Sequence, residues 1–347
     1  MTTISRTGNP QRSAEDRVVD VLDASMLDGS ATDRHRFITS LTRACENSGT
    51  FYVVNHSVPA SLCESVIEAS RAFFDLPADA KSGIDIKRSE HFRGYSVMTN
   101  DRDWREQVHF GREQSPVDHG SATPDYYQLQ GPNLWPQQLG ETWRKTMLSY
   151  LDAVMKFGSQ IANAVAEAAG LTDDYFDNLG NNSAYILMKL ICYYPQVRNH
   201  RARNGVATHC DWSLLTVLLQ SDAGLQTQSR NGEWIDVPPV SGALVINLGE
   251  LIEITTSGRF RATPHRVINQ SWDTPRISIP VFINPSLDAT INPGRNQQAS
   301  AERIYSHTHR VINPDHTIEP FIFGKREWNR KGLGRWCYSD KCYDYQN

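Results

Sequence analysis

The chain has 347 residues, of which 39% are hydrophobic and 21% charged, with a formal net charge of −4 at pH 7. These proportions are ordinary for a globular protein with a buried core. The slightly acidic balance argues against the basic surface that nucleic-acid-binding and membrane-surface proteins present to their anionic partners. The polar segment Met1 to Ala14 lacks the apolar core of a secretory signal, and no run approaches the roughly 18 apolar residues that cross a bilayer. We therefore expect a cytoplasmic protein with no nucleic-acid or membrane partner, acting as a monomer or a weak homo-oligomer.

The first third of the chain predicts short strands and amphipathic helices. Residues 18–22 have the composition of a short strand, and apolar residues spaced by three or four predict a helix over 34–48. Gly49 ends this helix, and the β-branched and aromatic residues 50–54 follow as a strand. A second helix is expected to begin after Pro59 and to continue to about residue 74.

The next segment, 75–136, is predicted to be rich in loops, with two ordered islands at residues 93–95 and 103–106. A long helical pattern then runs from Trp143 to Ala169 and ends at Gly170. From residue 183 to about 285, short apolar strands follow one another between Gly, Pro, Asn and Asp residues, as in an antiparallel barrel. A last helix is predicted over 299–309.

Together these elements predict an α+β fold, a double-stranded β-helix (a jelly-roll, cupin-like barrel) with N-terminal helices packed outside it. The predicted division is a mobile N-terminus (1–16), an N-terminal region (17–140), connecting helices (141–182), the jelly-roll core (183–288) and a C-terminal segment (289–347). The last segment either covers the active site or lies on the outside of the barrel.

Six cysteines lie at positions 45, 63, 192, 210, 337 and 342, with no CxxC pair. Scattered cysteines in an intracellular chain are typical of buried thiols rather than of a disulfide framework. Cys337 and Cys342 are close enough in sequence to form a redox pair.

The residues that indicate chemistry begin with His209-Cys210-Asp211 and a distant His265. Residues two apart in a strand point to the same face, so His209 and Asp211 can converge on one point. Two histidines and one carboxylate on one face of an octahedron suit Fe(II) and leave three positions open. Zinc also accepts such a set with an open site, so the ligands alone do not identify the metal.

Arg276 and Ser278 lie two residues apart on an apolar strand, the first of them eleven residues after His265. Their side chains share a strand face, and a guanidinium fork matches a carboxylate bidentately. A dicarboxylic 2-oxo acid could therefore bind iron through its oxo and C1 carboxylate groups while Arg276 and Ser278 hold its distal carboxylate.

The order HxD, a histidine about 55 residues later, and RxS resembles the isopenicillin N synthase-like branch of the iron(II)/2-oxoglutarate-dependent dioxygenases. The likeness runs from about Val18 to Pro285 and includes the segments 44–56, 73–77, 103–106 and 242–250, which are similar to family motifs in the same order. It implies an oxidoreductase that uses Fe(II), 2-oxoglutarate and O2 on a small organic molecule, in specialised metabolism.

By the same resemblance, His209, Asp211 and His265 match the iron ligands, and Arg276 and Ser278 match the co-substrate clamp. Tyr194, in a Tyr-Tyr-Pro stretch, matches a tyrosine that reaches 2-oxoglutarate, although Cys192 stands where plant members carry Asn. Arg93 matches an arginine that meets a substrate carboxylate. Arg93 and Tyr193 are therefore candidate substrate-binding residues, and the substrate is expected to bear a carboxylate. No catalytic residue is expected beyond the metal centre.

Three alternatives stay open at this point. An oxidase of the isopenicillin N synthase type keeps the same ligands and RxS but uses no 2-oxoglutarate. A catalytically silent barrel could bind a small molecule or a protein partner, but it would need neither the triad nor the clamp. A zinc hydrolase would leave Arg276 and Ser278 without a function. The sequence does not distinguish hydroxylation from desaturation or oxidative cyclisation.

Overall fold

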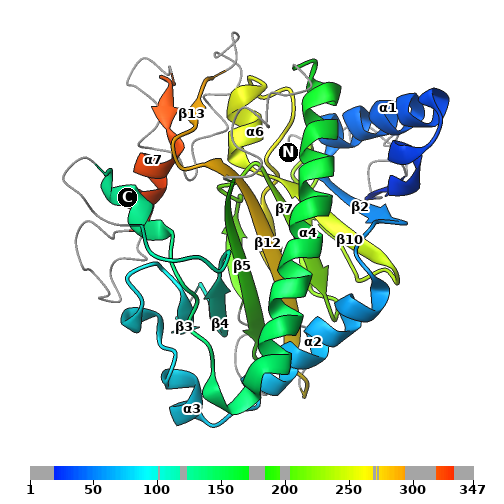
Figure 1. Cartoon of the computed structure of the whole chain (residues 1–347). Helices are drawn as coiled ribbons and strands as arrows, with labels where there is room; N and C mark the ends of the chain where they lie inside the picture. The colour runs from blue at the N-terminus through cyan, green and yellow to red at the C-terminus, as the bar shows by residue number, and fades with distance from the viewer. Residues whose placement is uncertain are drawn as a thin grey trace, which may run out of the picture.

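Two β-sheets pack against each other through a shared buried apolar cluster. Helices cover the larger sheet on one side (Figure 1). The computed structural model describes residues 19–100, 102–117, 123–171, 184–195, 204–268, 271, 273–293 and 318–331. Within these residues, no helix is both long enough and apolar enough to cross a membrane.

The larger sheet has eight strands in the order β1-β2-β10-β7-β12-β5-β4-β3, of which β1 and β2 are parallel and all other neighbours antiparallel. In that order the strands are Asp20–Asp23, Thr50–Val54, Ala243–Leu248, Leu215–Gln220, Arg276–Ser286, Ala184–Tyr193, Trp104–Phe110 and Gly94–Thr99. The smaller sheet has the order β6-β11-β8-β9, with strands Val206–His209, His265–Val267, Leu225–Gln228 and Trp234–Asp236. A short pair, β13 (Thr290–Ile291) and β14 (Phe321–Ile322), lies near helix α7.

The long helices α1, α2 and α4 lie on one side of the larger sheet (Figure 1). The α-helices are α1 (Ala31–Asn47), α2 (Ala60–Phe74), α3 (Ala78–Ser82), α4 (Gly140–Ala169), α6 (Glu250–Thr255) and α7 (Phe323–Arg330). The 3₁₀ turns are η2 (Ala24–Asp28), η3 (Ile86–Arg88), η4 (Asp125–Leu129) and η5 (Gln137–Leu139). Helix α4 ends where predicted, because Gly170 adopts a left-handed conformation (φ 75°) that terminates the helix.

The two faces of strand β12 have different roles: one packs into the core under the helices, and the other lines a cavity. Its alternate residues Ile277, Ile279, Val281 and Ile283 are buried in the core beneath the helices. The residues between them, Ser278, Pro280, Phe282 and Asn284, line a cavity between the two sheets. Because side chains alternate across a strand, one apolar stripe anchors the helices while the other stripe carries polar groups inward.

The structure confirms the predicted α+β class, with N-terminal helices outside the sheets. Helix α1 begins earlier than expected, because Ser30 and Asp33 form a capping box at its start. The predicted loop-rich character of 75–136 is wrong in part, since its two islands are strands β3 and β4 and extend the larger sheet. The short helix α6 lies in a region where only strands were expected. The helix predicted over 299–309 lies outside the described residues.

The described cysteines 45, 63, 192 and 210 are free, as predicted. Cys337 and Cys342 lie outside the described residues, as does most of the C-terminal segment 289–347. The N-terminal region is not a separate layer, because its strands β1 to β4 form both ends of the larger sheet.

Candidate metal centre and its cavity

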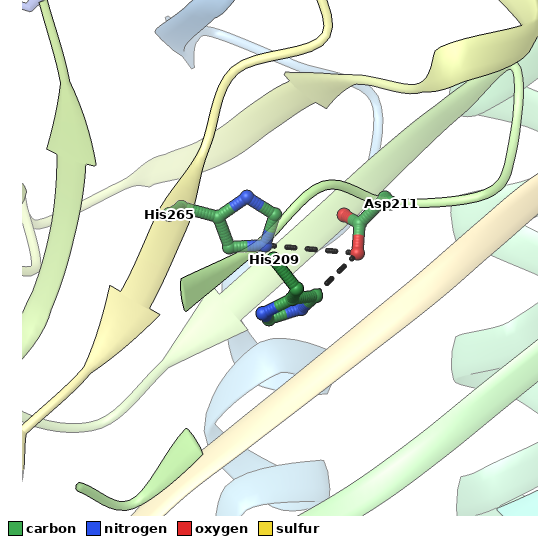
Figure 2. Close-up of side chains that lie close together, drawn as sticks. All are labelled: His209, Asp211 and His265. Carbon is green, nitrogen blue, oxygen red and sulfur yellow. Dashed lines mark ion pairs between the residues drawn. The ribbon is translucent and has the colours of Figure 1, made fainter. Parts of the chain in front are cut away.

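The two sheets enclose a cavity of about 360 Å³ whose lining includes His209, Asp211 and His265. Three parts of the chain bring these side chains together. His209 ends β6, Asp211 lies in the loop before β7, and His265 begins β11 (Figure 2). His209 and His265 are direct partners in the antiparallel register of β6 and β11, so their rings lie 4.3 Å apart between centroids.

The three side chains converge on one point. The Oδ1 atom of Asp211 lies 3.6 Å from the Nε2 atom of His209 and 3.6 Å from that of His265. One candidate ligand atom from each residue lies within 4.8 Å of the other two. Among the described residues, this is the one group of three or more His, Cys, Asp or Glu side chains arranged closely enough to hold a metal ion.

Backbone contacts orient both imidazole rings. The Nδ1 atom of His209 lies 2.9 Å from the Ala207 carbonyl, and that of His265 lies 3.0 Å from the Thr263 carbonyl. A carbonyl oxygen only accepts, so each Nδ1 carries the proton and each Nε2 presents a lone pair towards Asp211. Burial, more than any other factor, lowers the pKa of His265, which favours the neutral ligand form.

Asp211 is oriented in the same way. Its Oδ2 atom accepts a hydrogen bond of 2.7 Å from the Thr216 hydroxyl, which leaves Oδ1 facing the two histidines. Burial alone would raise the pKa of Asp211, but His265, His209 and Thr216 outweigh that effect and hold it well below its usual range. A buried carboxylate beside two imidazoles fits a divalent metal, and the set of two nitrogen donors and one oxygen donor suits Fe(II).

Arg276 is buried within the cavity wall, with 1% of its surface exposed. Its Nε donates to the Asp222 carbonyl at 3.0 Å, one terminal nitrogen donates to Gln220 Oε1 at 2.6 Å, and the other contacts the Ser278 hydroxyl. A further side-chain hydrogen bond links the guanidinium to Tyr193, so the charge of Arg276 is held in a fixed place beside the cavity, where it can pair with a carboxylate. Ser278 itself lines the cavity. Arg276 and Ser278 therefore lie together on one strand face, as the spacing predicted.

The two adjacent tyrosines occupy different places from those expected. Tyr193 lines the cavity and is the register partner of Arg276, whose guanidinium lies 5.2 Å from the centre of its ring. Tyr194, expected at the co-substrate, lies beyond the end of β5 and outside the cavity lining, against the Trp104 ring at 5.7 Å. Adjacent residues of an extended chain point in opposite directions, so only one of the pair can face the cavity.

Arg93, predicted to bind the substrate, lies outside the lining of this cavity. It is 2% exposed, and its guanidinium donates to the backbone carbonyls of His91 at 3.0 Å and Leu129 at 3.1 Å. A Cβ at Gly111 would lie 2.2 Å from the Arg93 side chain, so the chain packs tightly around it. Arg93 therefore links two loops, and its guanidinium donates its hydrogen bonds to their backbone carbonyls.

Several polar cavity residues were not anticipated from the sequence. They come from β4, β5 and α7, and are Arg105, Gln107, His109, Lys189, Glu327, Arg330 and Lys331. The alternation of Arg105, Gln107 and His109 could have indicated a strand with one polar face, had 75–136 been recognised as containing strands. Nothing in the local sequence indicates that α7 reaches the cavity, because that contact is purely tertiary.

Comparisons with known proteins agree with this geometry. Residues 19–138 match the family profile described as non-haem dioxygenase in morphine synthesis N-terminal, and residues 185–285 match that of the 2OG-Fe(II) oxygenase superfamily. The second match includes His209, Asp211, His265, Arg276 and Ser278.

The chain is 34% identical to the 2-oxoglutarate-dependent dioxygenase frbJ of Dothideomycetidae sp. (strain 11243) over 282 residues, which are 78% of this chain and 75% of that protein. It is 30% identical to Kihadalactone A synthase of Citrus sinensis over 290 residues, which are 79% and 84% of the two chains. The crystal structure of full-length Neurospora crassa T7H with alpha-KG and thymine is similar with a TM-score of 0.74 at 22% identity, covering 93% of this chain and 99% of that one. The likeness in fold confirms the predicted jelly roll.

Proposed function

This chain belongs to the 2OG-Fe(II) oxygenase superfamily, and from that premise we propose that it oxidises a carbon–hydrogen bond of a small organic molecule by hydroxylation, desaturation or oxidative cyclisation. It is a 2-oxoglutarate-dependent dioxygenase that uses Fe(II), 2-oxoglutarate and O2. The observation that carries the proposal is that the His209–Asp211–His265 cluster, Ser278 and Tyr193 line one cavity. The buried guanidinium of Arg276 lies in the wall behind Ser278 and Tyr193.

In this proposal His209, Asp211 and His265 would hold the iron. The iron, together with 2-oxoglutarate and O2, would supply the oxidising power, and the protein would supply binding, orientation and a site shielded from water. Arg276 and Ser278 bind the distal carboxylate of 2-oxoglutarate, and Tyr193 takes the place that the sequence suggested for Tyr194. These roles are supported by the burial of the side chains and by their hydrogen bonds to the protein, which fix their positions before any ligand binds.

We also propose a role in specialised metabolism, supported by relatives such as Kihadalactone A synthase that are named for the synthesis of a single compound. The cytoplasmic location, the monomeric or weakly oligomeric state and the absence of a nucleic-acid partner stay predictions. The carboxylate expected on the substrate stays a prediction as well.

The test is spectroscopic. Fe(II) is added to the apo-protein without oxygen, 2-oxoglutarate is titrated in, and the visible metal-to-ligand charge-transfer band is recorded. A saturable band is expected for the wild type and for His35→Ala, a control on the exposed face of α1. His265→Ala should lose the band, because a ligand is missing while the fold is kept. Iron binding without a band would favour an oxidase that does not use 2-oxoglutarate, and no iron binding would favour the silent barrel.

A further inference from the structure

A second positive centre lies in the cavity, separate from Arg276. It consists of Lys189 on β5, Arg105 on β4, and Arg330 and Lys331 at the end of α7, all of which line the cavity. We call these four residues the basic cluster. Helix α7 lies beside the end of the larger sheet (Figure 1).

The carboxylates near the basic cluster do not balance its charge. Glu327 pairs with both Arg330 at 2.8 Å and Lys331 at 3.0 Å, and Asp103 pairs with Arg105 at 3.0 Å. Within the described residues, these two carboxylates pair with three members of the basic cluster, and Arg102 adds another positive charge to the lining. Burial, more than any other factor, raises the pKa of Glu250 well above its usual value, which disfavours the charged form of that acid. The charge of Asp211 is met by the metal in the proposed function.

Lys189 is the member of the cluster without an ion pair within the described part of the chain. Its Nζ lies 5.2 Å from the centre of the Phe282 ring, within the cavity wall. Burial and then the charges of Arg105, Lys331 and Arg330 lower the pKa of Lys189 to about 7, and Asp211 opposes them. An anion bound beside Lys189 would relieve this unfavourable desolvation and repulsion.

Lys189 is too far from Arg276 to serve the same carboxylate. Arg276 is the register partner of Tyr193, and Lys189 precedes Tyr193 by four residues on the same strand face. Four residues of strand extend about 13 Å. The four carbon–carbon bonds of 2-oxoglutarate, each about 1.5 Å, place its carboxyl carbons less than about 6 Å apart. A molecule held by Arg276 therefore leaves Lys189 for a different ligand.

Polar atoms without a hydrogen-bond partner among the described residues lie near Lys189. His109 is the register partner of Lys189 and is 1% exposed, and in the described part of the chain neither of its ring nitrogens has a hydrogen-bond partner. Gln107 Oε1 and Asn284 Oδ1 are likewise buried without a partner, and both residues line the cavity. Buried polar groups are rarely left unpaired, so this part of the cavity has the character of a binding site for a polar ligand.

We propose that the substrate is a carboxylic acid whose carboxylate binds Lys189 beside Arg105, with its apolar part against Phe282 and Leu187. The proposal rests on the proposed function and specifies the substrate class for that site. The substrate is small, because about 360 Å³ of cavity also holds 2-oxoglutarate. Arg93, which the sequence suggested for this role, is replaced by residues of β4 and β5.

The experiment uses the full chain loaded anaerobically with Fe(II) and saturating 2-oxoglutarate. A mixture of small carboxylic acids, their matched primary amides, and phosphate and sulfate esters is equilibrated with the protein, and retained compounds are identified by mass spectrometry. Retention of acids without their amides is expected. Affinity should fall by about 30-fold or more in Lys189→Met, because a buried charge partner is lost. Lys156→Met, an exposed control on α4, should retain the same acids as the wild type.

Lys189→Met should unfold at no lower temperature than the wild type, because it removes an unpaired buried cation; Lys189→Gln, which keeps a polar tip, provides a second variant. Equal retention of acids and amides, equal affinity in the Lys189 variants, preference for the phosphate or sulfate esters, or retention of no acid would each overturn the assignment. The charge-transfer band is recorded on the same samples. A band without acid binding refutes the inference alone, whereas loss of the band refutes the proposed function.

Discussion

Replacing Arg276 with alanine should weaken 2-oxoglutarate binding far more than it weakens iron binding. The guanidinium hydrogen-bonds Asp222, Gln220, Ser278 and Tyr193, so the side chain is held rigidly beside the cavity. The residue is 1% exposed, so a carboxylate paired with it is shielded from water.

Removing one partner of such a buried, hydrogen-bonded charge pair costs about 2–5 kcal/mol. This corresponds to a 2-oxoglutarate Kd raised by about 30-fold to a few thousand-fold. Arg276→Lys should give an intermediate loss, because an ammonium group keeps the charge but loses the planar fork. The Kd is measured by anaerobic titration of the Fe(II)-loaded protein, following the visible charge-transfer band.

The matched control is Arg266→Ala on β11, a strand of the smaller sheet. Arg266 donates to Gln226 at 2.8 Å and stacks 4.0 Å from the Trp234 ring, and it does not line the cavity. Its removal should leave the 2-oxoglutarate Kd unchanged. A folded Arg276→Ala variant that binds 2-oxoglutarate within threefold of the wild type would refute the clamp, whatever happens to its thermal stability.

Thr216→Val removes the hydroxyl that orients Asp211 and should weaken Fe(II) binding by about 10- to 100-fold; unchanged iron affinity in a metal titration would contradict this. Gly49→Ala should lower the melting temperature much more than Gly140→Ala. Both glycines have a positive φ, but a Cβ at Gly49 would lie 2.0 Å from the Arg261 backbone carbonyl oxygen, whereas a Cβ at Gly140 would meet nothing within 4 Å. Similar melting temperatures would refute the steric argument. The pKa of Lys189 is about 7 when folded and 10.5 ordinarily, so the unfolded chain binds more protons between these values. The stability gained by Lys189→Met should therefore be largest below pH 7 and shrink as pH rises to 10.5; denaturant unfolding that shows a constant difference would contradict the burial of that amine.

The elements with local signals were predictable. Helix α4 has a continuous apolar stripe and a terminal Gly170, and strand β2 matches its expected bounds of residues 50–54. Strands β3 and β4 were missed as strands because their polar inward residues, such as Gln107 and His109, hide the apolar alternation. Those residues are stable inside the molecule only because β4 pairs with β5 at the edge of a cavity.

Some features of the candidate site were likewise predictable from the sequence, and others depend on the tertiary structure. The spacing of His209, Asp211, His265, Arg276 and Ser278 is a property of the sequence alone, because strand periodicity and ligand chemistry restrict which residues can meet. Which tyrosine faces the cavity depends on the register of Arg276 with Tyr193, and the burial of Arg93 depends on loops that close over it. The basic cluster around Lys189 joins residues up to 226 positions apart, from Arg105 to Lys331. No local pattern encodes that contact, since it exists only where β4, β5 and α7 are packed around one cavity.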